Sequence, residues 1–504
     1  MTQPSKVLFL GIDAAEQSLL FEWAREGLLP TFQSLLGRGA WGLTRNPPGL
    51  YVGAIWPSFH TSLSPTRHMR YCYEQLRPRT YEDFRVGPIH IEGEPFWETL
   101  SRQGRHLAVI DVPKARLAHE LNGIQIADWC THDPEYDGVR TYPEPLAADI
   151  VREYGHDPVG KCDGRRRTAE EYRAFRDAVL ERIQAKTKLV LDILQRADWE
   201  CVLAVFADSH CIGHQCWHLH DPTHPRHDSE IVLELGDPMK DVYRALDAAI
   251  GRILAAAGDE TTSIVLASHG MGPHYEATFM LDAILRAIEP QETPKGQPGT
   301  TKVLGQVWEH LPQGLREVLR PLSHKAKSLV DPVTMRRSSR RCFKVPNNDV
   351  FGGIRVNLRG REPVGKVDPD DYERYCAFLR ESLRAFENLD SGTPLVKEVW
   401  RTQEMYPGEN TSGLPDLLVE WNRDFPISRI SSPKTGDIEA TYAGCRTGDH
   451  RDQGLFIVVG PGIKAARQVE QVSVMNFGPT IAELLGVTLP GVDGQSIMPK
   501  LAVN

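Results

Sequence analysis

Residues 6–13 read KVLFLGID, an apolar run of strand length that ends in a carboxylate. Three later runs are also predicted strands: His106–Val112, Cys201–Ala207 and Ser263–Ala267. A strand that is apolar on both faces is typical of a parallel sheet with helices covering both sides. The pattern therefore predicts an α/β fold built on a mostly parallel, doubly wound sheet.

Segments with helical spacing separate these runs. Ser18–Leu36 places leucines and a tryptophan on one side of a predicted amphipathic helix. Thr168–Arg196 predicts a long helix that Thr168 can cap, with acidic residues in its first turn. Pro238–Ala257 and Phe477–Leu485 are further predicted helices. In such folds ligands bind beyond the carboxyl ends of the strands, so a site is expected there.

The regular alternation breaks at Glu289–Thr301, which carries three prolines and two glycines and is interpreted as a linker. A strand, a helix and a strand follow and predict a small α+β insert: Ile354–Leu358, Asp370–Phe386 and Val396–Arg401. The doubly wound pattern is predicted to resume at Asp416–Glu420. We therefore expect a core made of residues 1–290 and 411–504, with a smaller cap or insert made of residues 291–410.

The composition is that of an ordinary globular protein, since 41% of the 504 residues are hydrophobic and 25% are charged. Lys and Arg number 58 against 67 Asp and Glu, so a nucleic-acid partner is not expected. No stretch of 18 apolar residues occurs, so no membrane-spanning helix is expected. Because the first strand starts at about Lys6, no signal peptide is expected. The nine scattered cysteines are interpreted as reduced thiols of a cytoplasmic protein.

Side chains that bind metals stand at or beside the predicted strand ends. Four such places occur: Asp13, the pair His210 and His214, Ser268-His269, and Gly448-Asp449-His450. Imidazole nitrogen and carboxylate oxygen are ligands that zinc and similar cations favour. His210 and His214 are four residues apart, so one helical turn would place both on one face. Together these residues indicate a metal site at one edge of the sheet.

Each of these residues also has an ordinary structural interpretation. Asp13 could cap the next helix, and His269 could be a hydrogen-bonded histidine of the core. The four histidines between residues 218 and 227 are interpreted as part of a polar loop. Cys211 and Cys216 lie on either side of the second paired histidine, but their spacing matches no structural zinc pattern. The joint placement, rather than any single residue, favours the metal site.

Five short motifs occur along the chain in an order that is typical of one enzyme superfamily. They are Gly11-Ile12-Asp13, Trp56-Pro57-Ser58, Gly213-His214, His269-Gly270 and Gly448-Asp449-His450. In this order the chain resembles the alkaline phosphatase superfamily, and most closely its type I phosphodiesterase/nucleotide pyrophosphatase branch. Supporting segments extend the resemblance from Val7 to about Asp493. It implies the alkaline phosphatase-like fold and the hydrolysis of a phosphate ester or phosphodiester at a two-metal site.

Three positions depart from the pattern of that family. Ile55 stands at the position of the family's threonine or serine nucleophile. His210 replaces a metal-binding aspartate, and Ser268 replaces the aspartate that precedes the next conserved histidine of the family. The resemblance then implies two unequal metal sites, which are a first site of His210, His214 and His450 and a second that retains only Asp13 and His269.

The loss of carboxylates limits how many cations such a site can hold. Two dications about 4 Å apart repel by roughly 4 kcal/mol per unit-charge product at an effective dielectric constant of 20, and by about four times that for double charges. A single carboxylate among histidines offsets little of this repulsion. We therefore expect one zinc ion, with a weaker second ion possible and with iron or manganese as alternatives. Three histidines with an open fourth position are a catalytic pattern.

The expected function is a metal-dependent hydrolase that attacks a small phosphate-containing substrate with metal-activated water, because Ile55 has no hydroxyl. Asp13 and His269 are the expected general base or acid. One alternative is a shifted nucleophile at Ser58, near a helix start, and another is that Ser58 only caps that helix. A pseudoenzyme that keeps the fold without hydrolysis, or a metalloenzyme with other chemistry, also stays open.

Overall fold

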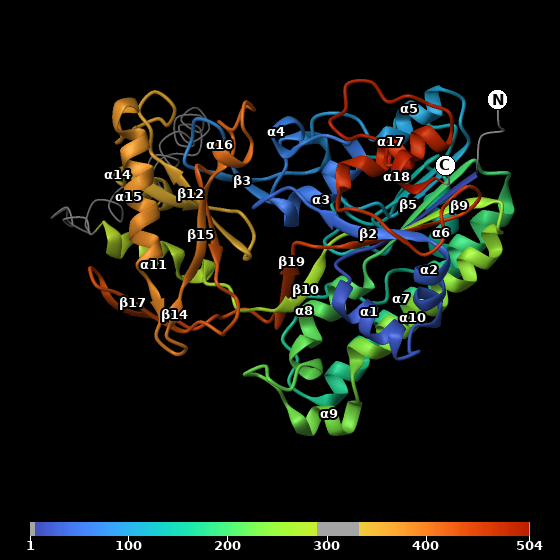
Figure 1. The fold of residues 1–504 in the computed structure, drawn as a ribbon, viewed down its shortest axis with the longest axis horizontal. Coiled ribbons are helices and arrows are strands. Elements are labelled where there is room, and N and C mark those ends of the chain that lie inside the picture. The colour runs from blue at the N-terminus through green and yellow to red at the C-terminus, as the bar shows by residue number, and fades with distance from the viewer. Residues whose placement is uncertain (1–5, 290–331, 503–504) are drawn as a thin grey trace, which may run out of the picture. The chain divides into compact units, whose positions relative to one another are not determined.

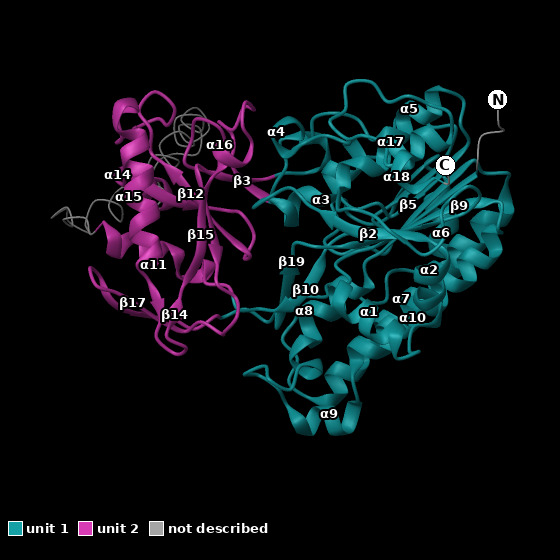
Figure 2. Ribbon diagram, viewed as in Figure 1, with its two compact units in different colours: residues 1–73, 86–275, 443–504 teal, residues 74–85, 276–442 magenta. Residues whose placement is uncertain are grey.

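The computed structural model describes residues 6–289 and 332–502. It divides into two compact units (Figure 2). The first unit comprises residues 1–73, 86–275 and 443–504, and the second comprises residues 74–85 and 276–442. Apart from Glu289, the predicted linker lies outside the described residues.

The first unit is built on a ten-stranded sheet whose order is β21-β2-β20-β9-β1-β8-β5-β6-β7, with β22 beside β2. Its centre is parallel and consists of β1 (Lys6–Ile12), β5 (Leu107–Ile110), β6 (Gly123–Ala127), β8 (Cys201–Phe206) and β9 (Thr261–Ala267). Further out lie β2 (Ala40–Arg45), β7 (Arg140–Tyr142), β20 (Leu455–Val459), β21 (Arg467–Gln468) and β22 (Val472–Ser473). Only the pairings of β20 with β2 and β9 and of β7 with β6 are antiparallel within this described sheet. The prediction of a mostly parallel sheet is confirmed.

Helices cover both faces of this sheet (Figure 1). On one side, Leu8 and Leu10 of β1 belong to a core that includes residues of α7 (Ala169–Arg196), α8 (Asp208–His220) and α10 (Pro238–Ala257). On the other side, Phe9 stacks on Phe59 of α3 (Tyr51–Thr61) with ring centroids 4.6 Å apart. Phe59 in turn meets Phe96 of α5 (Phe96–Arg102). Alternate residues of β1 therefore enter two apolar layers, as the unbroken apolar run predicts.

Most of the predicted helices form at the predicted places. Thr168 caps α7, because its hydroxyl accepts the Glu171 N–H at 3.2 Å while the Glu171 carboxylate accepts the Thr168 N–H. The prediction of one helix over 18–36 is wrong, since α1 (Gln17–Arg25) and α2 (Pro30–Arg38) are separate. Gly27, with φ of 79°, turns the chain after α1, and Pro30 starts the next helix. The other helices of this unit are α4 (Pro65–His68), α6 (Leu146–Tyr154), α9 (Ser229–Leu235), α17 (Phe477–Leu484) and α18 (Met498–Leu501).

The second unit is α+β, with a four-stranded antiparallel sheet of β11 (Cys342–Val345), β12 (Phe351–Val356), β16 (Leu417–Trp421) and β15 (Val396–Arg401). Its helices within residues 276–289 and 332–442 are α11 (Leu281–Ile288), α14 (Pro332–Ser339), α15 (Tyr372–Arg384) and α16 (Thr402–Met405). Smaller sheets are formed by β14 (Thr393–Pro394), β13 (Glu387–Asn388), β17 (Arg429–Ser432) and β18 (Gly436–Glu439), and by β3 (Glu74–Leu76) and β4 (Asp83–Arg85). The described part of the predicted insert lies within this unit.

The second unit is larger than the insert predicted over 291–410. It consists of one long segment, Glu276–Tyr442, and one short segment from earlier in the chain, Glu74–Arg85. The strand predicted at 416–420 forms as β16, but it does not rejoin the parallel sheet as predicted. It pairs antiparallel with β12 and β15. Its side chains are buried on both faces here too, and periodicity alone does not say which partner strand it has.

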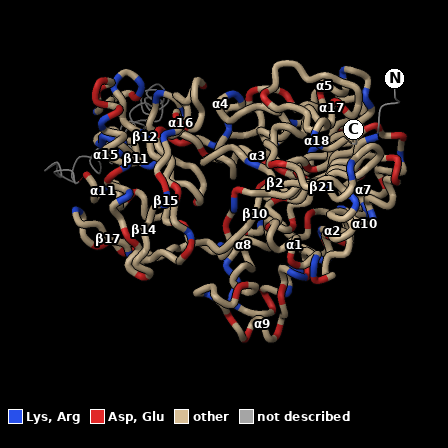
Figure 3. The backbone as a smooth tube through the Cα atoms, viewed as in Figure 1, with Lys and Arg blue, Asp and Glu red and all other residues tan. Residues whose placement is uncertain are grey.

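Charged residues of both signs are interspersed along each unit (Figure 3). Over residues 6–289 and 332–502, the structure has no helix both long and apolar enough to cross a bilayer.

Candidate metal centre

Three parallel strands bring the predicted site residues to one edge of the sheet. β1 lies between β8 and β9, with Ile12 beside Phe206 and Ala267. Asp13 and Ser268 are the first residues after β1 and β9, and Asp208 is the second residue after β8. All three therefore lie at the carboxyl ends of neighbouring strands. The parallel register thus places these three segments at one edge of the sheet.

Helix α8 and a short pair of antiparallel strands supply the histidines. His210 and His214 lie one turn apart on α8, which begins at Asp208 directly after β8. His450 lies on β19 (Gly448–Arg451), which pairs antiparallel with β10 (Gly270–Pro273), so that it stands opposite Met271. β10 follows His269 immediately, and Figure 1 shows β10, β19 and α8 together. The pairing of β10 with β19 therefore brings His450 beside His269 although the two residues are far apart in the sequence.

A close backbone approach fixes β19 against α8. A Cβ atom on Gly448 would lie 2.3 Å from the carbonyl oxygen of Gly213, so no side chain fits there. The Thr447 N–H donates to the His214 carbonyl at 2.7 Å. The His214 ring in turn donates from Nδ1 to the Gly448 carbonyl at 2.7 Å. These contacts set the orientation of the His214 ring.

Three buried imidazoles meet at this place. The ring centroids of His210 and His450 are 4.8 Å apart, and those of His214 and His450 are 4.6 Å apart. The Nε2 atoms of His210 and His214 are 2.9 Å apart. One nitrogen from each of the three rings lies within 4.8 Å of the others. The structure thus brings together the three residues predicted for the first metal site.

The hydrogen-bond partners determine which nitrogens carry protons. His210 donates from Nδ1 to Oδ2 of Asp13 at 2.7 Å, and His214 donates from Nδ1 to a carbonyl. In the neutral rings, both Nε2 atoms therefore carry lone pairs, and these lone pairs face each other. Burial lowers the pKa of His210, and it lowers those of His214 and His450 well below the ordinary value, so the neutral rings are favoured. Two opposed lone pairs in a buried place fit a bound cation.

Asp13 accepts hydrogen bonds from three side chains beside the histidines, including His210. Its Oδ1 accepts the indole N–H of Trp56 at 2.8 Å and the hydroxyl of Ser268 at 3.2 Å. Burial alone would raise the pKa of Asp13, but His210, His269 and the Trp56 N–H hold it below its usual value. The alternative that Asp13 caps the next helix is wrong, because Glu16 caps α1.

Ser268 and His269 form a chain of hydrogen bonds that ends at His450. Because the Ser268 hydroxyl donates to Asp13, its oxygen accepts from Nδ1 of His269 at 2.9 Å. Nε2 of His269 then accepts from Nδ1 of His450 at 2.8 Å. Burial lowers the pKa of His269 to about 4, so the ring is neutral at pH 7. This chain leaves the remaining nitrogen of His450 with a lone pair.

The nucleophile region differs from what its Trp-Pro-Ser motif predicts. The expected helix start beside Ser58 is wrong, because α3 begins at Tyr51 and runs through Pro57. The helix therefore begins nearly two turns before the proline, and Tyr51 and Ala54 are buried on that added part. Ser58 is therefore neither a cap nor at the positive end of the helix dipole. Ile55 is fully buried on the same helix.

Ser58 has its own histidine partner. Its Oγ lies 2.9 Å from Nε2 of His68, while Nδ1 of His68 accepts the Arg70 N–H at 3.2 Å. Burial lowers the pKa of His68 to about 3, so the ring is neutral and its single proton lies on Nε2. His68 therefore donates to Ser58, and a donor does not act as a general base. The catalytic role predicted for Ser58 stays a prediction that this geometry does not favour.

Two residues beside the centre were not assigned from the sequence. Trp56 belongs to a motif that the sequence shows, but its bond to Asp13 is visible only in three dimensions. The ring of His132 lies against that of His210, with centroids 3.9 Å apart. His132 follows β6 in a loop, where no spacing or motif marks it.

Three solved structures have a similar fold at low sequence identity. Human ectonucleotide pyrophosphatase/phosphodiesterase 5 is 12% identical with a TM-score of 0.51, over 99% of this chain and 100% of that chain. Its murine counterpart, an inactive variant in complex with AMP, is 11% identical with a TM-score of 0.51, over 97% of each chain. Phosphonoacetate hydrolase from Sinorhizobium meliloti 1021, in complex with phosphonoacetate, is 14% identical with a TM-score of 0.54, over 94% of each chain. At such identities these likenesses show an alkaline phosphatase-like fold.

A search of curated proteins finds no match. The sequence itself matches a family model over residues 7–448, from β1 to the start of β19. That span includes Asp13, the α8 histidines and His269, and it ends two residues before His450. The chain therefore belongs to the type I phosphodiesterase/nucleotide pyrophosphatase family of the alkaline phosphatase superfamily.

Proposed function

We propose that the protein is a metal-dependent hydrolase of small phosphate esters or phosphodiesters, with one divalent ion held by His210, His214 and His450. The observation that carries the proposal is the pair of opposed Nε2 atoms of His210 and His214, 2.9 Å apart, each with its Nδ1 proton already donated. Three neutral nitrogen ligands fit zinc first, and iron or manganese second. Membership of the family supports the hydrolytic chemistry.

The chain's own residues divide the work around that ion. When bound, a divalent ion at three imidazoles polarises an ester oxygen and lowers the pKa of a coordinated water. Asp13 holds the His210 ring in the tautomer that leaves Nε2 free. Asp13 and His269 are the groups that we assign to proton transfer, and Nε2 of His269 accepts a proton only after it releases the hydrogen bond from Nδ1 of His450. A weaker second ion at Asp13 and His269 would compete with these hydrogen bonds.

Substrate class follows from the relatives. A murine relative binds AMP and a bacterial relative binds phosphonoacetate, so a small phosphorus-containing molecule is the substrate class proposed here. Three probes distinguish the possible activities. Aryl phosphodiesters test for phosphodiester hydrolysis, aryl phosphomonoesters test for phosphomonoester hydrolysis, and phosphonoacetate tests for phosphonate hydrolysis.

The step at phosphorus is proposed to be a single displacement. Ile55 offers no hydroxyl at the family's nucleophile position, so no phosphorylated protein intermediate is expected. The test uses a phosphate ester made chiral with oxygen isotopes and hydrolysed in labelled water. One in-line attack inverts the configuration at phosphorus. Net retention, or phosphate trapped on Ser58, would instead require a covalent intermediate.

A second candidate function is a binding protein that keeps the metal but does not hydrolyse. It is favoured by the side chains at the three altered positions, Ile55, His210 and Ser268. An assay of the zinc-loaded protein with the three probes distinguishes a hydrolase from a binding protein. Turnover that disappears on chelation and returns with zinc supports the hydrolase. A protein that binds the ion and a phosphonate yet turns over none of the probes is the binding protein.

A further inference from the structure

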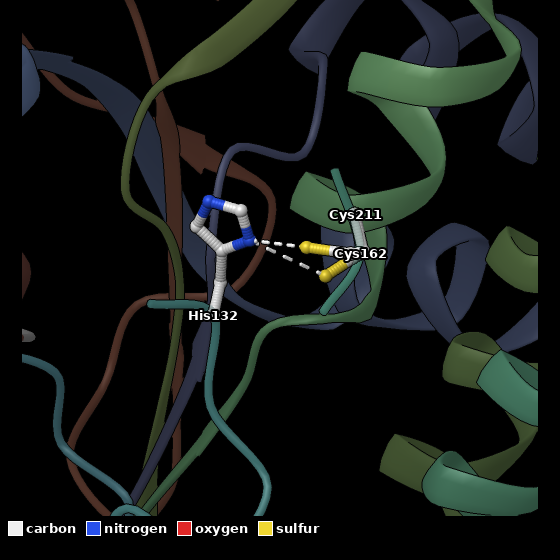
Figure 4. A group of neighbouring side chains, drawn as sticks. All are labelled: His132, Cys162 and Cys211. Carbon is white, nitrogen blue, oxygen red and sulfur yellow. Dashed lines mark hydrogen bonds between the residues drawn. The ribbon is translucent and has the colours of Figure 1, made fainter. Parts of the chain in front are cut away.

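A second group of metal-binding side chains lies next to the three-histidine centre. It consists of His132, Cys162 and Cys211, whose ligand atoms all lie within 4.8 Å of one another. All three are buried, with exposed fractions of 7%, 5% and 0%. Figure 4 shows one ring nitrogen of His132 facing both sulfur atoms. None of these residues belongs to the motifs that the family resemblance uses.

The distances suit a tetrahedral ion bound by sulfur and nitrogen. With zinc–sulfur bonds of about 2.3 Å and zinc–nitrogen bonds of about 2.0–2.1 Å, a sulfur and a nitrogen ligand lie about 3.6 Å apart. Nδ1 of His132 lies 3.6 Å from Sγ of Cys211. It lies 2.6 Å from Sγ of Cys162, so that side chain would move outward by about 1 Å on binding.

Neighbouring groups orient the ligands as metal sites require. Nε2 of His132 lies 3.2 Å from a carboxylate oxygen of Asp133 and donates its proton there, so Nδ1 faces the sulfurs. Burial alone would lower the pKa of His132, but Asp133 and Cys211 raise it to about 9, so a metal ion has to displace the Nδ1 proton. A histidine ligand that donates its other N–H to a carboxylate is the usual arrangement around zinc.

The charges balance when an ion is bound. Nη2 of Arg182 lies 3.3 Å from Sγ of Cys211 and donates to it, which stabilises a thiolate. Arg182 is itself paired with Asp208 at 2.7 Å, so the guanidinium adds no net charge to the cluster. Two thiolates, a neutral imidazole and one dication then sum to zero, which lowers the cost of burying them.

We propose that His132, Cys162 and Cys211 form a second metal site that takes a thiophilic dication such as zinc. The ion would join the loop after β6 and the loop before α7 to the first turn of α8. Because the ring of His132 lies on that of His210, it would also hold His210 in place. Binding releases two protons to solvent, one from the Cys162 thiol and one from the hydrogen-bonded pair of His132 and Cys211. This site is separate from the proposed hydrolysis and does not depend on it.

Cobalt(II) is the probe, because cobalt bound to thiolates absorbs in the near ultraviolet and cobalt bound only to histidines does not. The protein is stripped of metal under reducing conditions and titrated with Co²⁺, then with Zn²⁺. The expected result for the wild type is a thiolate-to-cobalt absorption band that Zn²⁺ displaces. Absence of the band would overturn the proposal. The proposal would also fail if alkylation showed that Cys162 and Cys211 form a disulfide in the purified protein and if the reduced protein then bound no Co²⁺.

Variants then assign the ligands. Cys162→Ala and Cys211→Ala should each abolish the band and lower the bound cobalt by about one ion per chain. The matched control is Cys216→Ala, which removes a buried cysteine of the same helix outside the cluster and should leave the band unchanged. His214→Ala should keep the band while losing the other ion. A band that survives both cysteine variants would place the thiolates elsewhere and contradict the assignment.

Discussion

At the scale of single residues, the centre depends on where a few protons lie. Asp13 and the Gly448 carbonyl each take an Nδ1 proton, and this leaves two imidazole nitrogens without protons 2.9 Å apart. The aspartate that the family uses as a ligand at position 210 is absent. The carboxylate that remains, Asp13, acts on the centre through its hydrogen bond with the ring of His210.

Replacing Asp13 by asparagine tests that role. Asp13→Asn removes the charge that fixes the tautomer of His210, and carboxylates of this kind contribute about 10- to 100-fold to metal affinity. We therefore expect the affinity of the three-histidine site for zinc to fall by about that factor. A chelator competition titration measures it. The control is Asp237→Asn, which breaks a similar pair, between Oδ2 of Asp237 and Nδ1 of His220 at 2.7 Å, outside the centre. Equal affinities for wild type and Asp13→Asn would show that the ring needs no such support.

Ser58 gives the opposite prediction. Because His68 donates to its hydroxyl, nothing in this contact activates Ser58 as a nucleophile. Ser58→Ala should therefore change kcat/KM for the best of the three probes by less than about tenfold, well short of the 10²- to 10⁴-fold typical of a lost acid–base group. Ser64→Ala, another buried hydroxyl nearby in the sequence, serves as the control for packing effects. A loss of about 10³-fold or more confined to Ser58→Ala would move the nucleophile to that serine.

At the scale of secondary-structure elements, buried ion pairs tie helices to strands. In the first unit, Lys186 of α7 contacts Asp111 beyond β5 at 2.8 Å, and Arg182 contacts Asp208 beyond β8. In the second unit, Asp416 accepts hydrogen bonds from Arg361, from the Val356 N–H of β12 and from the Tyr372 hydroxyl of α15. Each pair positions a helix or loop against a sheet edge.

Asp416 predicts a pH dependence of stability. Burial alone would raise its pKa, but Arg361 holds the pKa below the ordinary value of 3.8. The pair therefore contributes its full stabilisation above pH of about 4, and the contribution is lost as the pH falls through the lowered pKa. Asp416→Asn should cost about 3–5 kcal/mol at pH 7, and the difference from wild type should shrink towards pH 3.

Hydrogen exchange of the β12 and β16 amides measures this cost locally, without assuming that both units unfold together. Asp371→Asn removes the exposed partner of Arg374 and should stay within about 0.5 kcal/mol of wild type at every pH. A penalty for Asp416→Asn that is equally large at pH 3 and pH 7 would mean that packing, and not the charge of Asp416, holds these strands.

At the scale of the whole molecule, the sequence predicts the sheet better than the division into units. β1, β8 and β9 are short, apolar on both faces and followed by polar residues, and such strands are recognisable without a structure. The capping box makes α7 equally clear. β16 is as apolar as these strands yet belongs to the antiparallel sheet, because residue pattern reports burial and not the partner strand.

The same limit applies to the sites. His210 and His214 were predictable as a pair because a helical turn brings them together, and His450 because the family motif marks it. His132 is 30 residues from Cys162 and 79 from Cys211, and only the meeting of two loops with α8 makes them neighbours. Spacing carries no information about such a meeting. The proton order through Ser268 likewise follows from distances that a sequence does not contain.

The most direct test of the central claim is anomalous diffraction at the zinc absorption edge, from crystals of the zinc-loaded protein. A peak is expected at about 2.0–2.1 Å from one nitrogen of each of His210, His214 and His450. In His214→Ala crystals grown in the same way, that peak should be lost. Zinc-loaded crystals with no peak among the three rings, or with zinc held by Asp13 and His269 in its place, would contradict the three-histidine centre.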